Sequence, residues 1–259
     1  MDLIFVFLIV IFGSILTFFS GFGLGTLLLP VFLLFFNAQE AILAVAIVHF
    51  FNSIFKFIYV RKHIVTNVLI KFGIPAIGAA LLGSYLLSSL SVFPHFFSYE
   101  LFGSHIEIHY MEFVIGFLII LFTWLESSSL FSSLKIDSKY YYLGGFLSGF
   151  FGGLSGHQGA LRSLFLKKSN LSKEELIGTS NAISLVIDLA RISMYLWMFS
   201  INSLTEHKNN YLILIGIIGA LIGVQIGNRL LKKITMKFLQ RIISICLFLF
   251  GLALMLGLL

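Results

Sequence analysis

Four ionisable side chains interrupt long apolar stretches of this chain, and together they could bind an anion. Lys56, Arg162 and Arg191 are cationic, and Asp188 is the clearest acid in those stretches. A charge at the centre of a membrane helix costs about 2.5–3.5 kcal/mol on insertion scales. Such side chains should therefore line the protein interior or a wet cavity, and three cations against one acid favour an anionic ligand.

Polar residues line one face of each of two predicted helices. In the helix at 40–59, the spacing i, i+3, i+4, i+7 places four residues on one face, namely His49, Asn52, Ser53 and Lys56. In the helix at 174–199, a comparable face carries Asn181, Ser184, Asp188, Arg191 and Tyr195. We hypothesise that Lys56 and Arg191 line opposite vestibules of one pathway. In the alternative interpretation, Lys56 snorkels to the membrane interface, and Asp188 pairs with Arg191 only to neutralise it.

Glycine-rich segments interrupt the apolar sequence at two places, SGFGLGT at 20–26 and SGFFGGLSGHQG at 148–159. Glycine allows the backbone angles that a break in a helix needs. A helix that starts after such a break presents N–H groups and a partial positive charge to an anion. Backbone at Gly23, Gly25 and Gly156 is therefore a candidate for ligand binding, and polar backbone at membrane depth must face protein or water.

Three side chains beside the second break are further candidates for substrate binding. Arg162 follows the break by about one turn, and its forked donors could hold an oxyanion in bidentate fashion. His157 could bind the ligand or relay a proton, and Gln158 could donate to the ligand. The structural alternatives are that Arg162 snorkels toward Lys167, that His157 is a packing residue, and that Gln158 satisfies loose carbonyls of the break.

The elements that carry these residues are predicted to be membrane helices. Of 259 residues, 59% are hydrophobic and 11% are charged, with a mean hydropathy of +1.04, whereas soluble domains are about half apolar and a quarter charged. Uncharged runs are long enough to cross a hydrocarbon layer of about 30 Å and lack the period-two alternation of a barrel. The chain is therefore predicted to be an all-α, polytopic helical bundle in the plasma membrane. Helices are expected at 3–20, 24–36, 40–59, 68–90, 110–127, 140–152, 158–167, 174–199, 209–230 and 238–258.

The distribution of basic residues predicts an inverted repeat. A single helix over 3–36 would be about 51 Å long, so it must bend. If each broken segment returns to its starting side, Lys208 alone lies on one face of the membrane, and all other loop Lys and Arg residues lie on the opposite face, which is a strong positive-inside signal. The residues on that opposite face are Arg61, Lys62, Lys71, Lys135, Lys139, Lys167, Lys168, Lys173, Arg229, Lys232, Lys233, Lys237 and Arg241. The prediction is one transporter domain over 1–259, with repeats near 3–127 and 140–258, six full crossings and both termini outside. Inverted repeats with broken helices near the midplane are typical of secondary transporters.

Other classes of site and partner are disfavoured. The net charge of +6 comes mainly from short loops, so no nucleic-acid partner is expected. A single cysteine, Cys246, excludes an internal disulfide and a cysteine metal site. The motif His105-x-Glu107-x-His109 could bind zinc, but a solvated polar loop is the preferred interpretation, and no cofactor is expected. No Lys or Arg precedes the first apolar run, so it is predicted to be a retained membrane segment.

The chain resembles the TauE/SafE sulfite exporter family, also called the 4-toluene sulfonate uptake permeases. The resemblance covers nearly the whole chain, through SGFGLGTLLLP at 20–30, SGFFGGLSGHQGALRS at 148–163 and GTSNAIS at 178–184, which contains Thr179 and Asn181. It implies a bundle of inverted repeats that moves sulfite, organosulfonates or related anions, with the glycine segments near the substrate. We therefore count Thr179 and Asn181 among the candidate substrate-binding residues.

Two other functions fit parts of the sequence. A passive anion channel would use the same residues, although inverted repeats favour alternating access. An intramembrane serine protease is the second alternative, because the segment from Gly153 to Gly156 resembles the rhomboid active-site motif. It would need a base within reach of Ser155, and the first break has no matching serine. For a transporter, Asp188 and His49 permit coupling to protons, and carbonyls of the broken helices permit coupling to sodium.

Overall fold

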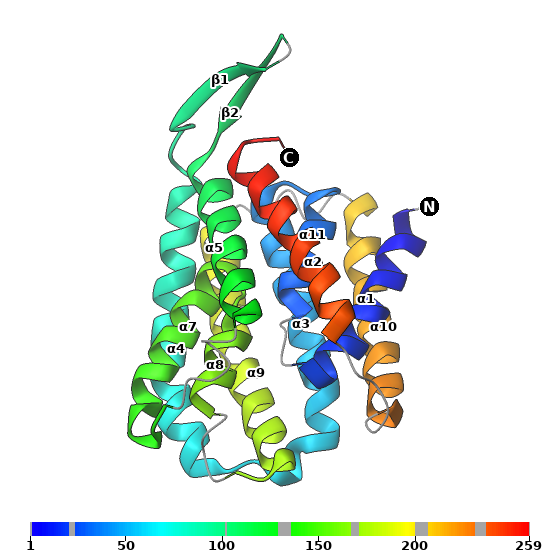
Figure 1. The fold of residues 1–259 in the computed structure, drawn as a ribbon, viewed down its shortest axis with the longest axis vertical. Coiled ribbons are helices and arrows are strands. Elements are labelled where there is room, and N and C mark those ends of the chain that lie inside the picture. The colour runs from blue at the N-terminus through cyan, green and yellow to red at the C-terminus, as the bar shows by residue number, and fades with distance from the viewer. Residues whose placement is uncertain are drawn as a thin grey trace.

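The computed structural model describes residues 2–20, 24–101, 103–128, 136–166, 171–199, 207–230 and 237–258. They form a bundle of helices with a two-stranded hairpin at one end (Figure 1). The helices are α1 (Asp2–Ser20), α2 (Leu24–Leu33), α3 (Ala38–Val60), α4 (Thr66–Leu90), α5 (Tyr110–Ser127), α7 (Tyr141–Ser155), α8 (Gln158–Leu166), α9 (Lys173–Met198), α10 (His207–Leu230) and α11 (Lys237–Met255). The 3-10 helices η1 (Arg61–His63) and η2 (Ser138–Tyr140) precede α4 and α7. Gly23 and Lys167 lie outside the described residues.

The helices agree with the predicted segments, with one difference in membrane-crossing length. Helix α1 ends at Ser20 and α2 begins at Leu24, and residues 21–23 of the first predicted break lie outside the described residues. Five helical stretches of the described chain are long and apolar enough to cross a membrane: Ala38–His63, Thr66–Leu90, Tyr110–Ser127, Lys173–Met198 and Asn210–Arg229. The predicted sixth crossing, α11, contributes a shorter apolar stretch within the described residues, Ile243–Met255. These helices indicate a multi-pass membrane protein.

The segment that contains the histidine motif is a hairpin and not the irregular loop that the sequence predicts. Strand β1 (Phe97–Leu101) pairs antiparallel with β2 (Ser104–Ile108), and Gly103 has a φ of 80° between them. Within the described residues, no group of three His, Cys, Asp or Glu side chains is arranged to hold a metal ion. Propensity alone did not reveal these strands because they are short and only partly buried.

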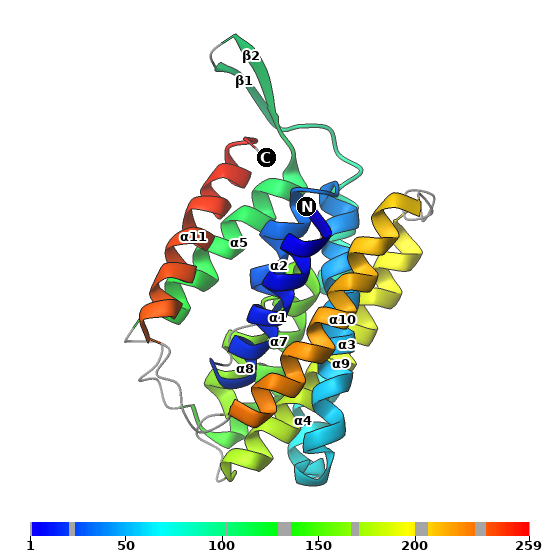
Figure 2. The ribbon, with the colours of Figure 1, turned by 90° about the vertical axis from the view of Figure 1, so that its right-hand side faces the viewer.

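The helices pack in pairs that are distant in sequence. Figures 1 and 2 show α4 beside α7, α1 beside α10 and α5 beside α11, and contacts also join α3 to α9. The α4–α7 contact is close because α7 turns three glycines toward the backbone of α4, namely Gly145, Gly149 and Gly153. Small residues spaced by four allow such close approach of membrane helices, where van der Waals packing drives association.

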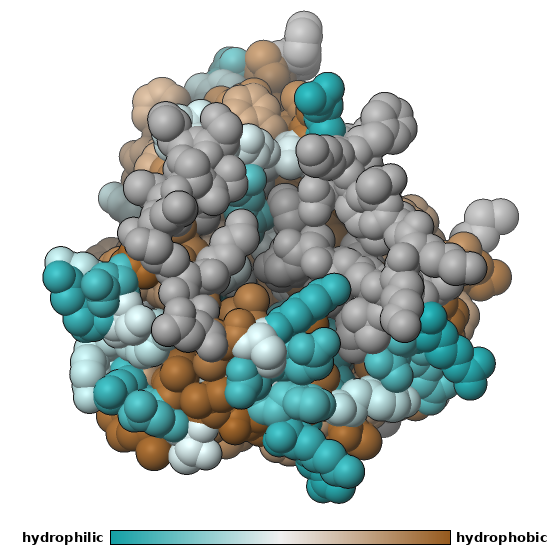
Figure 3. All heavy atoms as spheres, turned by 60° about the horizontal axis from the view of Figure 1, so that its bottom comes forward, coloured by the Kyte–Doolittle hydropathy of each residue, from teal (hydrophilic) through white to brown (hydrophobic). Residues whose placement is uncertain are grey.

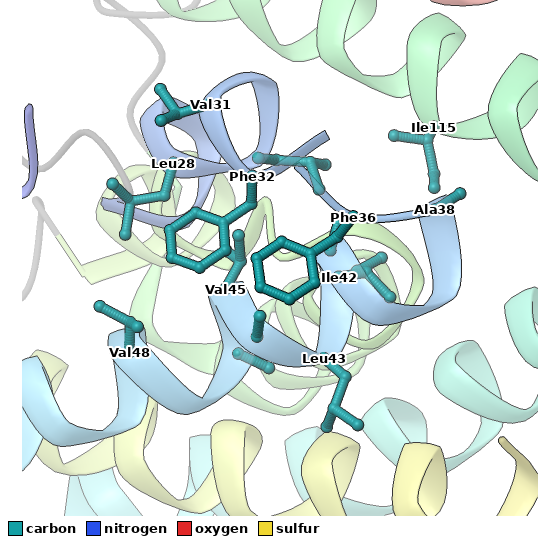
Figure 4. Close-up of a cluster of buried hydrophobic side chains, with 14 of the residues drawn as sticks. Leu28, Val31, Phe32, Phe36, Ala38, Ile42, Leu43, Val45, Val48 and Ile115 are labelled. Atoms are coloured by element: carbon teal, nitrogen blue, oxygen red, sulfur yellow. The ribbon is translucent and has the colours of Figure 1, made fainter. Parts of the chain in front are cut away.

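A cluster of apolar side chains holds α2 against α3 (Figure 4). Phe32 and Phe36 stack with ring centroids 5.6 Å apart and lie over the first turns of α3. The side chain of Asn37 accepts a hydrogen bond from the N–H of Glu40 and so caps α3. This packing fixes the short helix beside the polar face of α3.

The two ends of the bundle differ in character. Both chain termini lie at the end that carries the hairpin (Figure 1). The opposite end gathers hydrophilic side chains (Figure 3), and its exposed residues include Arg61, Lys62, Lys139 and Lys173. The connection between α3 and α4 lies at this basic end.

Candidate functional site

The carboxylate of Asp188 is the centre of a buried polar cluster. His49 Nδ1 lies 2.6 Å from Asp188 Oδ2. The other carboxylate oxygen, Oδ1, accepts hydrogen bonds from Gln158 Nε2 at 2.9 Å and from Arg191 Nε at 3.0 Å. All four residues are buried. Three helices that are far apart in sequence, α3, α8 and α9, thus meet at one carboxylate.

Local features explain why these helices present their side chains there. Asp188 and Arg191 are three residues apart on α9, so they share a face. The start of α9 is fixed by a capping box, in which Ser172 and Glu175 satisfy each other's backbone N–H groups. Asn181 Nδ2 donates to the carbonyl of Ser53 at 2.9 Å and holds α9 against α3.

Arg162 extends the cluster along α8 and α9. Its Nη1 donates to Gln158 Oε1 at 2.9 Å, and its Nε donates to Ser180 Oγ at 2.6 Å. A continuous hydrogen-bonded path therefore runs from His49 through Asp188 and Gln158 to Arg162. Lys56 is close enough to His49 and Arg162 for electrostatic repulsion with both.

The break between α7 and α8 supplies a second side of the site. Helix α7 ends at Ser155, Gly156 adopts a left-handed conformation with φ 80°, and α8 begins at Gln158. The guanidinium of Arg191 faces this turn, because a Cβ added at Gly156 would lie 2.8 Å from Arg191 Nη1. The break that the sequence predicts is therefore where the most buried cation of the chain points.

Two buried nitrogens at this break have no hydrogen-bond partner among the described residues. They are Arg191 Nη1 and His157 Nε2. Arg191 Nη2 lies 2.9 Å from Asp188 Oδ1 but outside hydrogen-bonding geometry. A buried polar nitrogen left unpaired costs about 1–3 kcal/mol, more for a charged group, so these two atoms are candidates for contact with a ligand.

The two glycine breaks meet at this place. A Cβ added at Gly25, at the start of α2, would lie 3.8 Å from the carbonyl oxygen of Gly156 and 3.9 Å from His49 Cδ2. Leu24, Gly25 and Thr26 are buried, so this part of the first break faces protein. The sequence predicted two breaks near one ligand, and the described part of both is in contact.

Several candidate residues lie away from the centre. The hydroxyl of Thr179 accepts a hydrogen bond at 3.0 Å from the N–H of Val65, at the start of α4, and Thr179 is about 13 Å from Asp188 along the helix axis. Asn52 is buried, and its Oδ1 has no partner among the described residues.

Arg191 is fully buried, whereas a residue lining an open vestibule would contact solvent. The hypothesis of a vestibule at Arg191 therefore does not describe this conformation.

The residues that sequence patterns missed are partners of the candidates. Ser180 receives the hydrogen bond from Arg162. Tyr195, by contrast, was placed on the polar face of its helix by the sequence, and its phenol donates to the carbonyl of Gly153 in α7. Phe122 of α5 stacks on the ring of His157 with centroids 5.3 Å apart. The sequence contains no signal for the Phe122 and Ser180 contacts, since both join helices whose mutual orientation is set by packing.

Ser155 and His157 form a contact that bears on the protease alternative. Ser155 Oγ lies 2.8 Å from His157 Nδ1, two residues along the chain. Ser155 Oγ also lies 3.3 Å from the carbonyl of Phe151 and can donate to it. His49, the other deep histidine, is bonded to Asp188 and not to Ser155.

The charges of the cluster suit an oxyanion. Arg162 and Arg191 bring two positive charges, and Asp188 is the carboxylate that both face. Buried charges are stable only when they are paired, so the excess of positive charge is best satisfied by an anionic ligand. A ligand with several oxygens can accept from both an arginine fork and an imidazole N–H.

Replacing Gly156 by alanine is expected to lower transport of an anion at least tenfold. The new Cβ would lie 2.8 Å from Arg191 Nη1, and the left-handed backbone would cost a further 1–2 kcal/mol or roughly tenfold in population. The measurement is initial exchange of radiolabelled anion in proteoliposomes. Gly103→Ala is the control, because Gly103 has the same φ of 80° with nothing within 4 Å of its added Cβ. Equal loss in both variants would contradict a special role for the Gly156–Arg191 contact.

Comparison with known proteins adds a family match. A family model described as "Sulfite exporter TauE/SafE" matches residues 6–254. Searches of curated proteins and of solved structures found no match. The matched range contains both glycine breaks and every residue of the buried cluster.

Proposed function

This chain belongs to the TauE/SafE sulfite exporter family, and from that premise we propose that it moves a small sulfur-containing oxyanion, sulfite or an organosulfonate, across the plasma membrane by alternating access. The family consists of membrane transporters and not of enzymes. The hydrogen bond between Ser155 and His157 therefore belongs to a transport protein, and the protease alternative is abandoned.

The observation that carries the proposal is the pair of unpartnered nitrogens at the α7–α8 break. Arg191 Nη1 and His157 Nε2 are both buried, and the charge of Arg191 acts on His157. A sulfur oxyanion presents several oxygens, so one oxygen can accept from the arginine while another accepts from His157 Nε2, in the tautomer in which Ser155 Oγ donates to His157 Nδ1 and Nε2 carries the proton. Gly25 lies next to the carbonyl of Gly156, so the start of α2 borders the same site.

The packing of the helices supports two repeats, α1 to α5 and α7 to α11. In this comparison α1 corresponds to α7, α2 to α8, α3 to α9, α4 to α10 and α5 to α11. When each helix is replaced by its counterpart, the α4–α7 contact becomes the α10–α1 contact, and the α4–α9 contact becomes the α10–α3 contact, and all four contacts are present. The α3–α9 and α5–α11 contacts are unchanged by this exchange. A contact pattern that survives the exchange is expected of two structurally equivalent repeats.

The ends of the chain support an inverted relation between the repeats. Helix α1 begins at the hairpin end, and α7 begins at the opposite, basic end (Figure 1). We propose that the basic end faces the cytoplasm, as the positive-inside rule predicts, and that the hairpin and both termini lie outside. On this topology the two broken segments enter from opposite sides and meet at Gly25 and Gly156.

The direct test of the function is counterflow in proteoliposomes. Vesicles are loaded with unlabelled anion, and uptake of the labelled anion is followed for sulfite, sulfoacetate, taurine, methanesulfonate and thiosulfate. Saturable uptake that depends on internal anion supports a carrier. Currents through single open channels would favour the passive channel, and the absence of exchange with every anion would refute the proposed function.

Arg162→Ala is expected to raise the half-saturating anion concentration about tenfold, because a hydrogen bond between a charged group and the anion contributes about 1.5–3 kcal/mol. The protein should remain folded. The variant loses the contacts of Arg162 with Gln158 and Ser180 and one positive charge of the cluster. Exchange rate against anion concentration measures the effect. Arg61→Ala, which removes an exposed arginine at the basic end, is the control. An unchanged half-saturating concentration for Arg162→Ala would remove this residue from the ligand site.

A further inference from the structure

The buried contact between His49 and Asp188 points to the coupling ion. We propose that this pair binds a proton that is transported together with the anion, in the same direction. The inference rests on the proposed function and deepens it. His49 belongs to α3 and Asp188 to α9, so the pair joins the two proposed repeats at a distance of 2.6 Å.

The pair can hold one proton or two. One proton occupies the hydrogen bond between His49 Nδ1 and Asp188 Oδ2, and the pair then has a net charge of −1. A second proton on His49 Nε2 forms the imidazolium and brings the pair to zero. The proton comes from hydronium on one side of the membrane, where an O–H bond breaks as the N–H bond at Nε2 forms, and on the other side the N–H bond breaks as the proton returns to water.

The surrounding charges couple this second proton to the anion. Helix α9 contributes Arg191, α8 contributes Arg162 through Gln158, and α3 itself contributes Lys56. Helix α2, which also packs on α3, has no charged residue, and the charged residues of α10 lie near its ends. Among the described residues, every charged group that acts on His49 other than Asp188 is therefore a cation.

An isolated proton on His49 is costly beside these cations, and a bound anion reduces that cost. By reciprocity, the proton strengthens anion binding by the same factor, and such coupling between sites commonly amounts to about 5–150-fold. The empty site and the site that holds both one proton and one monovalent anion have the same net charge. A site that holds only the proton or only the anion differs from the empty site by one charge. We therefore infer that only the empty form and the form loaded with both ions change conformation. Such a cycle is proton–anion symport.

The test uses an anion that cannot take up a proton itself. Sulfite exchanges protons with water, so cotransport of a proton with sulfite cannot be distinguished from transport of bisulfite. Methanesulfonate is the probe, with thiosulfate as a second permanently ionised anion, in proteoliposomes whose membrane potential is clamped at zero. An acid exterior one pH unit below the interior is expected to drive about tenfold accumulation in the wild type.

The variant is His49→Gln, which keeps hydrogen-bonding groups but cannot gain a proton. We expect the accumulation ratio to fall to about one, and the protons moved per anion to fall to zero, whatever the remaining rate of exchange. His95→Gln, at the exposed base of the hairpin, is the matched control and should keep the tenfold ratio. Exchange at equal pH in the same vesicles reports folding and anion binding.

Four results would overturn the inference. Accumulation by His49→Gln equal to that of the wild type would place the proton elsewhere, and exchange by the wild type without pH-driven accumulation would remove proton coupling. Accumulation driven by a sodium gradient instead would identify a different ion. Exchange of sulfite but of neither permanently ionised anion would mean that the proton travels on the substrate. In each case exchange persists, so the proposed function stands, whereas a protein that exchanges no anion refutes both.

Discussion

Arg191→Ala is expected to lower anion exchange by at least about 30-fold relative to the wild type. Arg191 Nη1 is buried at the α7–α8 break with no partner in the part of the chain that the structure describes, and it is the strongest candidate to hold the anion. Truncating one member of a buried hydrogen-bonded charge pair costs about 2–5 kcal/mol, which corresponds to about 30-fold to several thousand-fold in affinity. The measurement is counterflow at saturating and subsaturating anion concentrations.

The same substitution leaves the carboxylate of Asp188 without its nearest cation, which would destabilise the fold by about 3–5 kcal/mol. Two further variants separate this effect from ligand binding. Arg191→Lys keeps the charge beside Asp188 but lacks the second arm of the fork, so we expect normal thermal stability and a raised half-saturating concentration. The double variant Arg191→Ala/Asp188→Asn should be folded and inactive.

Arg229→Ala is the matched control for these variants, because Arg229 is an exposed arginine in the last turn of α10. It should retain exchange. If Arg191→Lys and the wild type had the same half-saturating concentration, and the double variant still exchanged the anion, Arg191 would have only a structural role.

Gly149→Leu is expected to prevent correct assembly of the bundle. A Cβ at this position of α7 would collide with the backbone of Ala76 in α4, including its carbonyl oxygen. Backbone atoms cannot rotate away, so the two helices must separate along their length. Overpacking of a tight contact costs about 1–3 kcal/mol for small additions, and a whole leucine side chain between two backbones exceeds that range.

The measurement is the yield of monodisperse protein in detergent and its thermal unfolding. Gly78→Leu is a stringent control, because Gly78 lies on α4 itself, is exposed, and has nothing within 4 Å of its added Cβ. That variant should match or slightly exceed the wild type, since glycine is a poor helix former. Normal yield and stability of Gly149→Leu would mean that the α4–α7 packing is not as close as the backbone positions indicate.

Helix positions and the choice of candidate residues were predictable because they depend on local properties. Apolar length indicates membrane helices, glycine clusters indicate breaks, and a charge inside an apolar segment is too costly to be incidental. His49, Asp188, Arg191, Gln158 and Arg162 were selected on these grounds, and the structure brings them into one network. The i, i+3 pairing of Asp188 with Arg191, which the structure contains, was the alternative interpretation of the sequence.

Other features were not predictable, because they depend on which helices become neighbours. Thr179 was proposed as a ligand residue from its motif, but its hydroxyl accepts from Val65 at the start of α4. Ser180, the next residue, is the one that contacts Arg162. Adjacent residues on a helix point about 100° apart, so a small change in orientation decides which of them faces a given partner.

Sequence alone determined that the chain is a helical membrane protein, that a glycine-rich break precedes Gln158, and that Asp188 and Arg191 are buried. Only the tertiary structure decided that His49 and not another residue meets Asp188, that Gly25 lies against Gly156, and that Arg191 Nη1 and His157 Nε2 are left without protein partners. The physical reason is the sequence distance over which each interaction acts. Hydrophobic length and glycine conformation act within a few residues of chain, whereas the pairing of α3 with α9 and of α4 with α7 depends on the close packing of backbones that are distant in sequence.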